Sequence, residues 1–190
     1  FSGLVPYLAT MEVANQAATS VRGNLSAIRG AFLPIEIVPA RIAGVAMATL
    51  AVGLVCTALL SAWTGRLSAN ILLLPAILLV QGLLFLGLAS ILAVLGALLR
   101  DIAHIVNLAS LAVLFLSPIA YTEQMLPPQL WFLRDLNPVF YLVDAYRTAL
   151  FDTGPVDWPR LGIFAVLSVL LFVGGAAMLR RFKGVATDNA

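Results

Sequence analysis

The sequence predicts an all-α integral membrane protein, from its composition and from long stretches without charge. Of its 190 residues, 62% are hydrophobic and only 11% are charged, whereas soluble domains carry about 25% charged residues. A bilayer core of about 30 Å requires roughly 20 helical residues. We expect one transmembrane domain, residues 1–190, with five spans at about residues 1–20, 42–63, 71–99, 102–121 and 159–179.

The predicted spans differ in how apolar they are. Residues 42–63 and 71–99 contain no charged side chain, and Pro75 permits a kink in the second of these. The first span is less apolar because Glu12, Asn15 and Gln16 interrupt it.

The loop after the first span reads "NLSAIRGAFLPIEIVPAR" (24–41), too polar for a span and too apolar for a plain linker. Asn24 is suited to cap a short helix. Four apolar residues share one face of that helix: Leu25, Ile28, Phe32 and Leu33. Pro34 ends it, and Pro39 is expected to enforce an extended approach to the next span. The apolar face would cover either the membrane interface or a groove on a cytoplasmic partner.

The basic residues predict the orientation. If residues 21–41 are cytoplasmic, alternation places these basic residues inside: Arg22, Arg29, Arg41, Arg100, Arg180, Arg181 and Lys183. The remaining ones lie outside: Arg66, Arg134, Arg147 and Arg160. Because basic residues are enriched on the cytoplasmic side of membrane proteins, we expect the C-terminus in the cytoplasm.

Residues 125–151 are as long as a span but contain Arg134, Asp135, Asp144 and Arg147. Each charge at mid-bilayer costs about 2.5–3.5 kcal/mol, so two re-entrant outer half-helices are expected instead. Pro127-Pro128 opens the first; Asn137 caps the second, with Pro138 at its first position. The second has an apolar stripe formed by Val139, Leu142, Val143, Tyr146 and Leu150. Asp144 and Arg147 are spaced to pair.

Several functions are excluded or disfavoured. A single Cys56 and a single His104 rule out a disulfide framework within the chain and a His- or Cys-cluster metal site. No G-x-x-x-x-G-K-[ST] motif is present, so this chain cannot hydrolyse ATP. A net charge of +2 gives no support for nucleic-acid binding. Ser110 and Ser117 lack a G-x-S-x-G elbow, which argues against a hydrolase.

The order of motifs resembles a known family: "NLSAIRGAFLPIEIVP", two spans, "RDIAHIV", "LFLSPIAY", "LNPVFYLVDAYRTALF" and a last span. It is similar to the permease subunit of type-2 ABC exporters, and most to the branch that exports lipid-linked polysaccharides such as O-antigen and teichoic acid precursors. The resemblance covers essentially the whole chain. It implies a further amphipathic helix and span before Phe1, so that the N-terminal part of the subunit would be missing.

The resemblance also implies roles. Residues 24–39 would be the coupling segment that docks on a separate ABC ATPase, through Asn24, Ile28, Arg29, Phe32, Leu33, Ile35 and Glu36. The half-helices would be the outer gate, with Pro127, Trp131, Asn137, Pro138, Asp144 and Arg147. Two permeases, a homodimer, would assemble with two ATPases in a bacterial cytoplasmic (inner) membrane. The chain itself would hold no cofactor, because MgATP binds the partner subunit.

Other residues have two readings each. Glu12 either lines the pathway or makes a polar subunit contact. Arg100, Asp101 and His104 form an inner gate or anchor the membrane boundary, and boundary anchoring is favoured. Four aromatic residues could stack on passing sugars or simply pack: Tyr7, Phe85, Phe115 and Tyr121.

The expected function is therefore ATP-driven export of a lipid-linked polysaccharide or its precursor. Three alternatives remain open at this point. The chain could belong to a type-2 exporter of drugs or small lipids, to a proton-coupled carrier that uses Glu12, or to a structural membrane subunit without transport.

Overall fold

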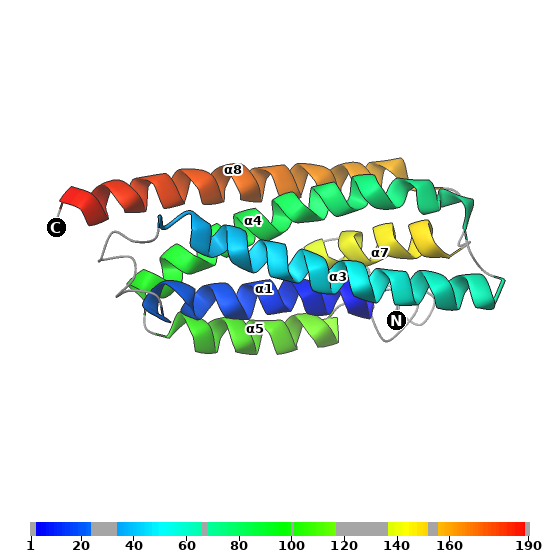
Figure 1. The fold of residues 1–190 in the computed structure, drawn as a ribbon, viewed down its shortest axis with the longest axis horizontal. Helices are drawn as coiled ribbons and strands as arrows, with labels where there is room; N and C mark the ends of the chain where they lie inside the picture. Colours follow the sequence, from blue (N-terminus) through cyan, green and yellow to red (C-terminus); the bar gives the residue numbers. More distant parts are fainter. Residues whose placement is uncertain are drawn as a thin grey trace.

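The computed structural model is built from helices, and it describes residues 3–23, 34–65, 68–99, 101–116, 137–151 and 156–188. The elements are α1 (Leu4–Gly23), α3 (Ile37–Trp63), the 3₁₀ turn η1 (Ala69–Leu73), α4 (Leu74–Leu98), α5 (Ile102–Leu116), α7 (Pro138–Leu150) and α8 (Trp158–Asp188). Helices α1, α3, α4 and α8 run side by side along the long axis of the bundle (Figure 1). Helix α4 is central and packs most extensively on α8 and α1.

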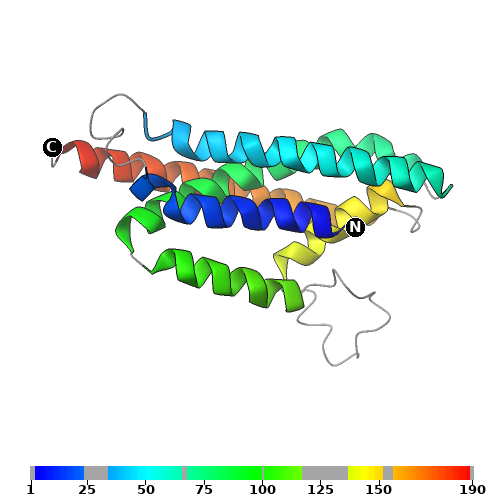
Figure 2. The same cartoon turned by 60° about the horizontal axis from the view of Figure 1, so that its bottom comes forward.

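Two helices occupy special positions. Helix α5 lies along the outside of α1 and has little contact with the remainder of the bundle (Figure 2). Short α7 lies at the end of the bundle where α3 ends and α4 and α8 begin (Figure 1). Helix α7 therefore lies at one end of the bundle, in contact with α8, η1, α1, α4 and α3.

Three segments are long and apolar enough to cross a membrane: Ile37–Trp63, Ala69–Leu98 and Trp158–Phe182. They correspond to the spans predicted at 42–63, 71–99 and 159–179. The apolar stretch Ile102–Phe115 of α5 is shorter than these three. Helix α1 is long enough but less apolar, because polar side chains interrupt it. An all-helical, multi-pass membrane protein is thus confirmed, while the count of five spans stays a prediction.

One expectation about proline was wrong. Pro39 does not force an extended approach, because α3 already begins at Ile37 and includes Pro39 in its first turn. The first amide groups of a helix have no partner within the helix, so a proline there sacrifices no hydrogen bond. Pro75 likewise lies at the start of α4, directly after η1, and not within a continuous helix.

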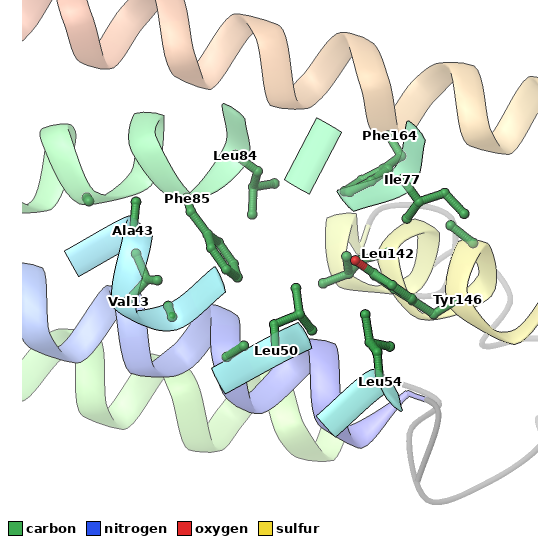
Figure 3. Close-up of a cluster of buried hydrophobic side chains, with 14 of the residues drawn as sticks. Val13, Ala43, Leu50, Leu54, Ile77, Leu84, Phe85, Leu142, Tyr146 and Phe164 are labelled. Atoms are coloured by element: carbon green, nitrogen blue, oxygen red, sulfur yellow. The ribbon is translucent and has the colours of Figure 1, made fainter. Parts of the chain in front are cut away.

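The core of the bundle joins α1, α3, α4, α7 and α8. Figure 3 shows Phe85 of α4, Leu50 of α3, Tyr146 of α7 and Phe164 of α8 turned toward one another. All four side chains are buried, and they belong to one hydrophobic cluster. Helix α7 is therefore part of the core and not a surface attachment.

Glycine permits the close approach of α4 and α8. A Cβ atom added to Gly175 of α8 would lie 2.5 Å from the carbonyl oxygen of Gly87 in α4. A Cβ atom on Gly87 would in turn collide with the backbone of Leu171 and Phe172. Because backbone atoms cannot yield as side chains do, only glycine fits at both positions.

Candidate functional site

The start of α7 has the structure that its sequence predicts. Asn137 is the N-cap residue, and its side-chain oxygen accepts a hydrogen bond of 3.0 Å from the backbone N–H of Val139. Pro138 follows in the first turn, where its fixed φ suits a helix and its missing N–H costs nothing. A short helix is present where the second half-helix is predicted, and residues 117–136, which include the first, lie outside the described part of the chain.

The apolar stripe of α7 faces the bundle. All five of its predicted members are at most 8% exposed: Val139, Leu142, Val143, Tyr146 and Leu150. The Tyr146 hydroxyl has no hydrogen-bond partner among the described residues, although the ring lies in the middle of the core. This stripe supplies the adhesion that keeps α7 at the end of the bundle.

An arginine of α8 contacts the flank of α7 beside this stripe. Nη1 of Arg160 lies 3.5 Å from Oδ2 of Asp144, and its guanidinium carbon lies 5.1 Å from the ring centre of Phe140, one turn earlier in α7. The spacing in the sequence predicts Arg147 as the partner of Asp144, whereas the structure pairs Asp144 with Arg160. Spacing within one helix cannot predict this pair, because it joins two different helices.

The capping of α8 holds the same arginine in place. Oδ1 of Asp157 accepts a hydrogen bond of 3.1 Å from the backbone N–H of Arg160, while Oδ2 lies 3.0 Å from the Nε atom of its side chain. One carboxylate thus satisfies a free amide at the N-terminus of α8 and also orients the guanidinium toward α7.

Two polar side chains fasten the C-terminal end of α7. The Ser61 hydroxyl of α3 donates a hydrogen bond of 2.9 Å to the carbonyl of Leu150. The Asn70 amide of η1 donates one of 3.5 Å to the carbonyl of Thr148. The last carbonyls of a helix lack intrahelical partners, and these bonds satisfy two of them. A cavity of about 10 Å³, room for roughly one water molecule, adjoins them between α7 and α8.

A polar contact joins α1 to α5. The Tyr7 hydroxyl donates a hydrogen bond to the backbone carbonyl of Ser110, and Asn15 reaches the Ser110 hydroxyl at 3.5 Å. Tyr7 is only 3% exposed, so within one chain it serves helix packing. Phe85 is likewise fully buried in the core. A role for either residue in a pathway remains a prediction.

A mixed polar and apolar surface runs along α1 and α5. Glu12 is partly exposed, and it accepts a hydrogen bond of 2.9 Å from Gln16 on the next turn. Asp101, just before α5, is exposed, and the exposed residues on α5 are His104, Ile105, Asn107, Leu108, Ala109, Leu111, Ala112 and Phe115. A polar side chain that lies within a membrane faces protein or water in preference to lipid. We call this surface the α1–α5 face.

The coupling segment is only partly described. Ile35 is buried against Val94 of α4 and Leu179 of α8, and Glu36 is exposed at the N-cap of α3. Nine further predicted site residues lie outside the described part of the chain: Asn24, Ile28, Arg29, Phe32, Leu33, Arg100, Tyr121, Pro127 and Trp131. Within the described ranges, no group of three potential metal ligands comes together.

Comparison with known proteins gives one family match and two relatives. The family model described as ABC-2 type transporter matches residues 1–151. Two curated relatives, both named O-antigen export system permease protein RfbA from Klebsiella pneumoniae, are 24% identical to the chain over 109 residues. That stretch covers 57% of this chain and 42% of each relative. The chain thus matches less than half the length of these relatives.

Proposed function

Because the chain belongs to the ABC-2 type transporter family, we propose that it is the permease subunit of an ATP-driven exporter of a lipid-linked polysaccharide or its precursor. Support for the substrate comes from the two relatives, which are named O-antigen export permeases. Support for a permease comes from three segments long and apolar enough to cross a membrane, together with the polar side chains of the α1–α5 face.

The proposed mechanism begins at the coupling segment. ATP would close a pair of partner ATPase subunits, and the coupling segments docked on them would move the helices that follow. This is a population shift, in which ATP favours the open arrangement because the ATPase binds it better in that state. Two copies of the chain would face each other across the α1–α5 face, with Glu12 and His104 beside the substrate path.

Two other functions fit part of the same observations. An exporter of drugs or small lipids would share the family and the helices, and would differ in substrate. A proton-coupled carrier would use Glu12. Among the described residues, its carboxylate has one hydrogen-bond partner, Gln16 on the same helix. Such a carrier would need no ATPase.

The energy source is the first test. In vesicles that contain the permease and its ATPase, removal of ATP should stop export of the lipid-linked glycan, and a proton uncoupler should leave export intact. Export that continues without ATP and stops with the uncoupler would instead establish the Glu12 carrier.

The proposed topology gives a second prediction. Single cysteines at Gln129, Asp135 and Asp152, in a Cys56→Ser background, should react with a membrane-impermeant maleimide added outside. A cysteine at Asp188 should react only after the membrane is opened, because the basic residues near the end of α8 favour the cytoplasmic side. Reaction at position 188 from outside would show that the assignment of five spans with re-entrant half-helices is wrong.

A further inference from the structure

We infer that Arg160 is a positioning residue that latches α7 in its closed position, and that this latch is built to open reversibly. The inference rests on the proposed function to the extent that α7 is an outer gate helix. Arg160 makes two contacts with α7, the ion pair to Asp144 and the cation–π contact with Phe140. Phe140 and Asp144 are four residues apart and so lie on the same face of α7.

The latch fixes the rotation of α7 more than its attachment. An apolar stripe determines which face of the helix packs on the core. It sets the exact rotation and register only loosely, since apolar contact has no directional requirement. The planar guanidinium requires a carboxylate at its edge and a ring at its face. Arg160 therefore adds a directional restraint midway along α7, while Ser61 and Asn70 restrain its C-terminal end.

Release of this contact leaves no buried charge without a partner. The side chain of Arg160 is 28% exposed and that of Asp144 is 20% exposed, so water reaches both. When the contact opens, Arg160 stays paired with Asp157 at 3.0 Å on its own helix, and water already reaches the Asp144 carboxylate. A buried pair would oppose separation far more strongly. The outer position and the second carboxylate thus make the contact suitable for repeated opening.

The C-terminal end of α7 is held by a hydrogen bond that water does not reach. Ser61 is 1% exposed and Leu150 is fully buried, so the hydrogen bond between them is shielded from water. In the released state Ser61 and Asn70 would therefore keep this end attached, while the turn that carries Asp144 would lose its fixed rotation against α8.

The test measures exposure of α7 directly. Ala145 is 8% exposed and lines the cavity between α7 and α8, so a cysteine there, in a Cys56→Ser background, should react slowly with an impermeant maleimide. Asp144→Asn, which leaves Arg160 paired with Asp157, should increase the labelling rate roughly three- to fivefold. Arg160→Gln should have a similar effect, and the double variant should label no faster than either single one.

Salt separates a latch from a general loss of structure. Raising sodium chloride should speed labelling of the parent protein, because salt screens exposed ion pairs, and should have little effect on the Asp144→Asn variant. Arg181→Gln, the same charge change at an exposed position near the other end of α8, should label like the parent. If Asp144→Asn labels at the parent rate, or keeps the full salt response, the latch does not exist. The assay needs neither ATP nor substrate, so a failed export experiment would not alter its outcome.

Discussion

Alanine in place of Gly175 is expected to destabilise the protein by roughly 1–3 kcal/mol, the usual cost of an overpacked site. The added methyl group would lie 2.5 Å from the Gly87 carbonyl oxygen, and it would also press on the Cβ atom of Ser90 at 3.1 Å. Since a backbone oxygen cannot rotate away, α8 must separate from α4. That separation weakens the most extensive helix contact in the bundle.

The neighbouring glycine is a matched control. A Cβ atom added to Gly174 meets nothing within 4 Å, so alanine there should be neutral or should stabilise α8 by up to about 1 kcal/mol through its better helix propensity. The two variants differ only in which face of α8 carries the methyl group. Thermal unfolding of purified protein in detergent measures the difference, and equal melting temperatures would show that α4 and α8 are not in close contact.

Aspartate in place of Phe32 is expected to abolish binding of the partner ATPase while the permease still inserts in the membrane. We base this on the predicted coupling segment, in which Phe32 is the largest apolar side chain. An unpaired charge placed in an apolar groove costs several kcal/mol, and every 1.4 kcal/mol is a tenfold change in affinity. The dissociation constant should therefore rise at least roughly a hundredfold.

Co-purification of the two subunits gives the readout. Phe32→Leu retains an apolar side chain and should keep most of the binding. If the aspartate variant binds the ATPase as well as the parent does, the segment does not dock through this residue, and its apolar face would instead cover the membrane interface.

Helix α7 shows what could be predicted from local sequence. Its cap, its proline and its apolar stripe each depend on residues within about four positions of one another, and the structure confirms all three. The partner of Asp144 could not be found in this way. Arg160 belongs to the next helix, and helical spacing is silent on which side chains of two helices meet.

Proline and glycine show a different limit. The rule that a proline disfavours helix for the preceding residue led to the wrong start of α3, because Pro39 occupies a first turn where prolines are tolerated. Gly174 and Gly175 are indistinguishable in sequence, yet only Gly175 approaches another backbone closely. That difference depends on which face of α8 meets α4.

The contact between Gly87 and Gly175 also constrains the order in which the protein can assemble during translation. Helix α4 is synthesised and inserted well before α8. Until α8 is made, the surface of α4 around Gly87 lacks the α8 backbone that packs on it in the complete protein. Ribosome-bound chains that stop before residue 158 should accordingly contain α4 in the membrane but lack its largest packing surface. Completion of the bundle is then a late event, and membrane proteases have their best opportunity to remove the chain in the interval before it.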